Sequence, residues 1–299
     1  MKTTIHVAVV QAGAVPFDSA ASIEKAEQRI AEAASGGAKL IVFPEAFVGG
    51  YPKGCDFGAR VGSRTPEGRK LFRRYFENAV EVEGPGTQRL GEAARVHGVW
   101  VVIGVIERAG GTLYCTALFF APDGTLAGKH RKVMPTAMER IIWGFGDGST
   151  LPVIETGFGR IGAVICWENY MPLLRSAMYA KGVQLYCAPT VDDRETWAVS
   201  MRHIAVEGRC FVLSACQYIE AGGEQMAAIR GGSSIVNPLG KVLAGPCYEG
   251  ECILRAELDL GEIAEGKFDL DVAGHYARPD LFRLEVNEAP QPPVKTSGS

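Results

Sequence analysis

The stretch RIGAVICWEN, residues 160–169, places an apolar run directly before a cysteine. Arg160–Ile165 has the composition of a buried strand, and Cys166 stands where that strand gives way to a helix. Two other apolar runs end in a similar way, one in the carboxylate of Glu45 and one in the ammonium group of Lys132. Because open α/β folds place their sites at the carboxyl ends of strands, these three positions are candidates for chemistry.

Strand-like and helical segments alternate on both sides of this stretch. The alternation predicts an α/β protein in which helices cover a mixed sheet or a pair of sheets. Adjacent hairpins in the middle of the chain argue against a purely parallel, doubly wound sheet. The predicted strands are Ile5–Gln11, Lys39–Phe43, Val99–Glu107, Leu113–Ala121, Thr125–His130, Arg160–Ile165, Leu185–Ala188, Phe211–Ala215, Ser233–Asn237, Lys241–Ala244 and Cys252–Glu257; the predicted helices are an amphipathic segment with Ile23, Ala26, Ile30 and Ala33 on one face, Gln88–Val96, a helix from Pro172 to Gly182, and Glu195–Glu207.

The composition predicts a cytoplasmic globular protein. The 299 residues contain no repeat or linker, so we expect one domain over residues 1–286 and a disordered tail, rich in Pro, Ser and Gly, over 287–299. The net charge of −3, without a basic stripe, argues against nucleic-acid binding. We expect no membrane association, since no apolar run reaches the roughly 18 residues of a span and no signal peptide is evident. Eight cysteines without zinc-site spacing predict reduced thiols and no metal.

Each of the three candidate positions also has an ordinary explanation. A cysteine after an apolar strand is usually a small buried hydrophobic residue. A glutamate after a strand is usually a solvated loop residue, and a lysine there usually lies on the surface. The pattern alone does not bring the three side chains together in space.

Three blocks of the sequence resemble the signature blocks of the carbon–nitrogen hydrolase (nitrilase) superfamily, and they occur in the family order. They are Phe43-Pro44-Glu45-Ala46-Phe47, His130-Arg131-Lys132 with Pro135-Thr136, and Cys166-Trp167-Glu168-Asn169. The stretches 49–54, 143–148, 186–190 and 271–276 resemble the true nitrilase branch in particular. The likeness covers about residues 3–285.

The resemblance implies a four-layer α-β-β-α sandwich and a cofactor-free homo-oligomer of two or more subunits. It implies hydrolysis of a small-molecule nitrile to the carboxylic acid and ammonia through a covalent thioimidate and thioester. On this basis Cys166 is the nucleophile, Glu45 the general base and Lys132 the electrostatic stabiliser. Glu139 matches a second glutamate that positions the substrate.

Tyr51 and Trp167 are candidates for the pocket wall, because substrate pockets are mostly apolar and aromatic. The alternative is that they are aromatic residues of the core or of an interface. Two functional alternatives also stay open. An amidase or N-carbamoyl hydrolase would use the same Glu45, Lys132 and Cys166, and a non-catalytic scaffold would keep only the fold.

Overall fold

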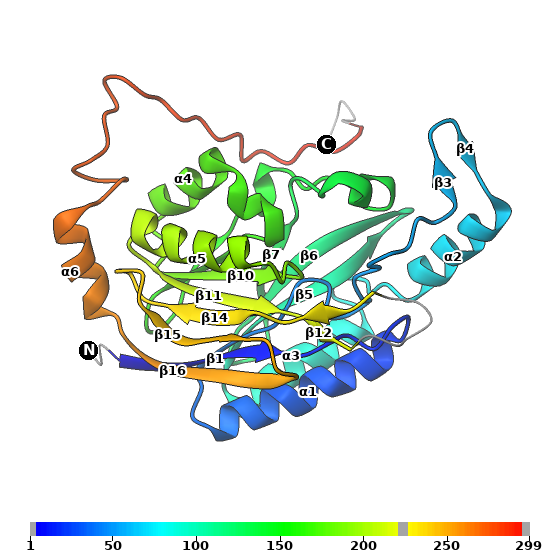
Figure 1. Ribbon diagram of the computed structural model, residues 1–299, viewed down its shortest axis with the longest axis horizontal. Coiled ribbons are helices and arrows are strands. Elements are labelled where there is room, and N and C mark those ends of the chain that lie inside the picture. The colour runs from blue at the N-terminus through cyan, green and yellow to red at the C-terminus, as the bar shows by residue number, and fades with distance from the viewer. Residues whose placement is uncertain (1–3, 221–226, 295–299) are drawn as a thin grey trace.

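The computed structural model describes residues 4–220 and 227–294, and two six-stranded sheets form its centre (Figure 1). The first sheet has the strand order β16-β1-β2-β5-β6-β7 and the second β15-β14-β11-β10-β9-β8. Both are mixed, because β1-β2-β5 and β9-β10-β11 are parallel while their neighbours are antiparallel. The strands are β1 (Thr4–Gln11), β2 (Leu40–Val42), β5 (Trp100–Ala109), β6 (Thr112–Phe120), β7 (Leu126–Arg131), β8 (Val153–Glu155), β9 (Arg160–Ala163), β10 (Leu185–Thr190), β11 (Phe211–Cys216), β14 (Ser233–Val236), β15 (Val242–Cys247) and β16 (Cys252–Asp259).

Alternating side chains of the central strands divide the interior into layers. In β1, Val7 and Val9 face the core between the two sheets, whereas Ala8 and Val10 face the outer helices, as the two-residue period of a strand requires. Helices α1 (Ser19–Ser35) and α3 (Pro85–His97) cover the first sheet, and α4 (Pro172–Ala180) and α5 (Glu195–Gly208) cover the second (Figure 1). The predicted α-β-β-α sandwich is therefore confirmed.

The helices at the predicted positions each bury an apolar face against a sheet. Ile23 and Ile30 of α1 are buried, and Asp18 caps the helix by accepting a hydrogen bond from the backbone of Ala21. Helix α3 ends at Gly98, whose φ of 60° is the left-handed conformation that favours glycine at this position. Helix α5 buries Trp197, Met201 and Ile204 on its inner face.

Several elements are not among those predicted. They are α2 (Pro66–Glu77), α6 (Gly261–Asp269), β8 and the short pairs β3 (Ala59–Arg60) with β4 (Ser63–Arg64) and β12 (Tyr218–Ile219) with β13 (Ile229–Arg230). Helix α2 has an apolar face at helical spacing, with Tyr75 buried and Leu71 and Phe72 packed against the core, although no helix was predicted there. After Cys166 the chain first forms a 3₁₀ turn, Cys166–Tyr170, and enters α4 only at Pro172.

The segment 287–294 contains no helix or strand, but it contacts the body of the protein. The backbone of Gln291 donates to Asp147 at 2.8 Å, and Lys181 forms an ion pair with Glu288 at 2.5 Å. Residues 295–299 lie outside the described residues. The single domain over 1–286 and the disordered tail stay predictions. In the part of the chain that the structure describes, no helix has the length and apolar character to cross a membrane.

Candidate active site

Three strand ends from the two sheets converge on one buried site. Glu45 follows β2 and Lys132 follows β7 in the first sheet, while Cys166 follows β9 in the second. Gly104 of β5 lets the loop with Glu45 pack closely, because a Cβ there would lie 2.3 Å from the Pro44 carbonyl oxygen. The chain thus brings together three residues that lie far apart in the sequence.

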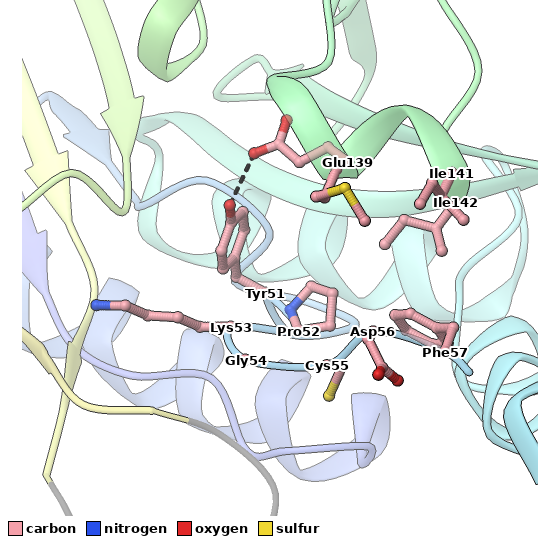
Figure 2. Close-up of a pocket in the computed structure, with 11 residues that line it drawn as sticks. Tyr51, Pro52, Lys53, Gly54, Cys55, Asp56, Phe57, Glu139, Ile141 and Ile142 are labelled. Carbon is pink, nitrogen blue, oxygen red and sulfur yellow. Dashed lines mark hydrogen bonds between the residues drawn. The ribbon is translucent and has the colours of Figure 1, made fainter. Parts of the chain in front are cut away.

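The ammonium group of Lys132 lies between two carboxylates. Its Nζ is 2.7 Å from Oε1 of Glu45 and 2.8 Å from Oε2 of Glu139. Lys132 and Glu45 are fully buried, and Glu139 is nearly so. The Tyr51 hydroxyl donates to the other oxygen of Glu139 at 2.8 Å (Figure 2). Tyr51 therefore holds Glu139, and Glu139 in turn holds the Lys132 ammonium group.

Burial and neighbouring charges shift the pKa of Glu45 and the pKa of Lys132. Burial raises the pKa of Glu45; the charge of Lys132 opposes this shift, and the charge of Glu139 adds to it. Burial also disfavours the charged form of Lys132, but Glu45 and the other acidic groups nearby outweigh that effect and raise the pKa of Lys132. Lys132 therefore stays charged, while the proton affinity of Glu45 is increased toward that of a general base.

Cys166 occupies a sharp turn at the end of β9. Its φ of 50° lies in the left-handed region, which costs a non-glycine residue about 1–2 kcal/mol. The side chain is buried, and the Thr190 hydroxyl donates to its sulfur at 3.1 Å. Burial and the nearby Glu45 charge raise the pKa of the thiol, against the effect of Lys132. Cys166 is consequently a neutral thiol that needs a base before it can attack.

Glu45 has one oxygen free for that task. Oε1 binds Lys132 and accepts a contact from the Cys115 thiol at 3.5 Å. Oε2 has no hydrogen-bond partner within residues 4–220 and 227–294. The backbone carbonyl of Glu45 accepts a hydrogen bond from the Gln217 side chain at 2.7 Å, which fixes the loop. A buried, unpartnered carboxylate oxygen can accept a proton from a reacting group beside it.

A cavity of about 300 Å³ opens onto the cysteine. Its wall includes Tyr51, Glu139, Cys166 and Trp167. The Trp167 indole N–H donates to Asp192 at 2.8 Å, which holds this partly exposed ring at the cavity wall. Both aromatic residues predicted for the pocket therefore lie at the cavity; their roles toward a substrate stay predictions.

Tyr51 also borders a second, smaller cavity. This space of about 160 Å³ extends from Tyr51 and Glu139 toward Phe57, Ile141 and Ile142 (Figure 2). Figure 2 shows the Tyr51 hydroxyl directed at the Glu139 carboxylate. The two side chains thus line both cavities.

Three residues at the site were not predicted as site residues: Cys115, Gln217 and Thr190, the last residue of the stretch 186–190. Cys115 and Thr190 lie in buried strands, and Gln217 follows one. Nothing in their local pattern distinguishes them from core residues, and their contacts depend on how the two sheets pack. Among the described residues, no group of three or more His, Cys, Asp or Glu side chains could hold a metal ion.

Comparison with known proteins identifies the family. Residues 6–268 match the family model described as carbon-nitrogen hydrolase. The chain is 58% identical to an aliphatic nitrilase of Sinorhizobium fredii, over 98% of this chain and 99% of that protein. It is 56% identical to a bifunctional nitrilase/nitrile hydratase of Lupinus angustifolius, over 97% of this chain and 88% of that protein.

A solved structure shows the same fold. Saccharomyces cerevisiae Nit3, a member of branch 10 of the nitrilase superfamily, superposes with a TM-score of 0.73 at 26% identity, covering 91% of this chain and 96% of that one. The family match spans most of the chain, and the nitrilase relatives align over nearly all of it. The chain therefore belongs to the carbon–nitrogen hydrolase family, and within it to the nitrilases.

Proposed function

We propose that this protein hydrolyses nitriles to the carboxylic acid and ammonia, with Cys166 as nucleophile, Glu45 as general base and Lys132 as electrostatic stabiliser. The observation that carries the proposal is the buried Lys132 ammonium group, held 2.7 Å from Glu45 and 2.8 Å from Glu139 near the Cys166 cavity. The activity printed for the Sinorhizobium fredii relative supports the choice of a nitrile.

The first step joins the cysteine to the nitrile carbon. Glu45 takes the thiol proton as the sulfur attacks, and the proton passes to the nitrile nitrogen, so the product is a neutral thioimidate. A thiol suits this weak electrophile, because a thiolate is intrinsically more nucleophilic than an alcohol. The fixed charge of Lys132 stabilises the negative charge that develops on the nitrogen.

The next steps release ammonia and then the acid. Glu45 deprotonates a water molecule that adds to the thioimidate carbon, giving a tetrahedral intermediate. Expulsion of ammonia leaves a thioester, and a second water releases the carboxylic acid and restores the Cys166 thiol. The balance is one nitrile and two waters to one acid and one ammonia. Lys132 stabilises each oxyanion in turn.

The intermediate can also break in the other direction. If the Cys166 sulfur leaves instead of ammonia, the enzyme releases the amide after a single water has been added. The name of the Lupinus angustifolius relative joins both outcomes, nitrilase and nitrile hydratase. We infer that acid is the main product here, because Lys132 and the paired glutamates favour loss of a protonated amine.

An amidase or N-carbamoyl hydrolase is the alternative with the same residues. The buried set of Glu45, Lys132 and Cys166 fits amide hydrolysis equally well, so the distinction depends on substrate kinetics. A non-catalytic scaffold is disfavoured, because burying two carboxylates and a lysine in one site costs free energy that a binding surface elsewhere would not require.

A substrate panel tests the proposed function. Purified protein is incubated with aliphatic, aryl and arylaceto nitriles, and ammonia, acid and amide are quantified for each. We expect ammonia and acid in equal amounts from at least one of these classes of nitrile. A Cys166→Ala variant should give no product. Absence of product from every nitrile would contradict the proposal.

We further propose that the protein is a homo-oligomer of two or more subunits that works in the cytoplasm. Large apolar side chains are exposed along the segment after α6, with Phe282 78% and Leu281 62% exposed. Exposed apolar clusters of this kind favour association with another chain. Light scattering should give a mass above that of the 32.0 kDa chain; a monomer at micromolar concentration would contradict this.

A further inference from the structure

A second buried charge pair lies beside the proposed catalytic residues. His130 stands two residues before Lys132, and Glu168 stands two residues after Cys166. The His130 Nε2 is 2.9 Å from Oε2 of Glu168, and both side chains are completely buried. The pair thus connects the strand end that carries the ammonium group to the turn that carries the thiol.

The hydrogen bonds of the ring fix its protonation. The Nδ1 of His130 lies 2.7 Å from the carbonyl oxygen of Thr150. A carbonyl oxygen only accepts, so Nδ1 carries a hydrogen. The pairing of Nε2 with the Glu168 carboxylate favours a second hydrogen on the ring, which makes it a positively charged imidazolium. Burial lowers the pKa of His130, but the charge and hydrogen bond of Glu168 and the bond to Thr150 outweigh it and raise the pKa.

The Glu168 carboxylate also binds the backbone on both sides of the site. Its Oε1 accepts from the N–H of Val133, the residue after Lys132, at 2.5 Å. Its Oε2 accepts from the N–H of Ile165, the residue before Cys166, at 2.9 Å. One carboxylate therefore holds the backbone next to the ammonium group and the backbone next to the thiol. Charge-assisted bonds of this type are short and geometrically specific.

We propose that His130 and Glu168 form a positioning pair that fixes the Lys132 ammonium group relative to the Cys166 sulfur and thereby sets the ratio of acid to amide product. The inference rests on the proposed nitrilase function. Neither side chain is among the residues that line the Cys166 cavity, so both act through Lys132 and Cys166.

The product ratio depends on this geometry because the two ways in which the tetrahedral intermediate breaks down, loss of ammonia and loss of the thiolate, need different placement of acid groups. Ammonia leaves only when the nitrogen is protonated, which requires correctly placed acid groups. The thiolate leaves without a proton, so its departure depends less on placement. A loosened link between Lys132 and Cys166 should therefore slow formation of the thioester more than release of the amide.

Two variants and one control test the proposal. Glu168→Gln keeps the size of the side chain but removes its charge and one acceptor. His130→Gln keeps one N–H donor and removes the cation. Glu207→Gln is the control, because Glu207 binds Arg175 and Tyr179 between α4 and α5, on the outer side of the second sheet. Each variant is tested for folding by gel filtration and thermal unfolding, and alkylation of Cys166 is followed by peptide mapping, because the chain has seven other free cysteines.

The decisive quantity is the amide fraction, because it does not depend on how much of the enzyme is folded. For Glu168→Gln and His130→Gln we expect a severalfold higher amide fraction and a kcat lower by on the order of a hundredfold, the effect of a small misplacement of a catalytic group. KM should stay near its original value, and Glu207→Gln should keep the original product ratio. If Glu168→Gln fails to fold, His130→Gln decides the question.

An unchanged amide fraction and kcat in the folded variants, with only a lower melting temperature, would overturn the proposal. Failure of the proposed function looks different, since the unmodified protein would then turn over no nitrile. If the unmodified protein prefers amides, the kcat comparison on an amide substrate tests only the positioning role, and the proposed control of the product ratio is then wrong.

Discussion

The Nζ of Lys132 lies 2.7 Å from Oε1 of Glu45, and both side chains are fully buried. In this environment their attraction is strong, but both groups have lost their hydration. A second carboxylate, Glu139, shares the same ammonium group at 2.8 Å. Burial, the largest cause, and the nearby charge of Glu139 raise the pKa of Glu45, although Glu45 forms an ion pair with Lys132.

Replacing Cys166 by alanine should abolish turnover and leave the fold intact. The substitution removes the nucleophile, and alanine is small enough to occupy the same buried turn. Ammonia release should disappear while the circular dichroism spectrum stays unchanged. Cys252→Ala, on β16, is the control and should keep its activity. Substantial activity in Cys166→Ala would show that another residue is the nucleophile.

Glu45→Gln and Lys132→Ala should each lower kcat by at least about a hundredfold. This is the size expected for loss of a proton-transfer group or of a charge that stabilises the transition state. Steady-state kinetics on one nitrile gives kcat and KM for each variant. Arg131→Ala is the matched control: Arg131 neighbours Lys132 but binds Glu107, and its loss should matter far less. A change in KM alone would contradict the assigned roles.

Tyr51→Phe should lower kcat/KM by about tenfold to a hundredfold, because a hydrogen bond to a charged group contributes about 1.5–3 kcal/mol. The substitution removes the hydroxyl that donates to Glu139 at 2.8 Å and keeps the ring at the cavity wall. Tyr276→Phe, at an exposed position, is the control. Equal kcat/KM in both variants would mean that the Tyr51 hydroxyl does not help to position Glu139.

The acid limb of the pH profile of kcat/KM should lie above pH 4.5, the ordinary pKa of a glutamate. Burial raises the pKa of Glu45, so this base becomes protonated and inactive as the pH falls through that raised value. Samples returned to neutral pH should regain full activity, which separates titration from acid unfolding. A reversible acid limb at or below pH 4.5 would show that the catalytic base does not have the raised pKa of Glu45.

The sequence alone could predict most of the elements and the three strand ends that carry chemistry. The alternation of apolar and helical segments predicted β1 and α5 to within one residue at each end, the core of α3, and the buried face of α1. It could not predict that the two sheets face each other, which came from the resemblance to a known family.

Contacts within the site were less accessible to sequence analysis. Lys132 and Glu45 are 87 positions apart, and His130 and Glu168 are 38 apart. Such contacts depend on strand order and sheet packing, which local patterns do not encode. The short elements, among them the turn at Cys166, were missed because few of their residues contribute to an apolar period.

The most direct test of the central claim is kcat/KM for matched pairs of nitrile and amide that carry the same side chain. Ammonia release measures both reactions, and a Cys166→Ala control measures the background. We predict a higher kcat/KM for the nitrile across several side chains, with acid as the main product. Faster turnover of the amides across the series would contradict the account and identify the protein as an amidase.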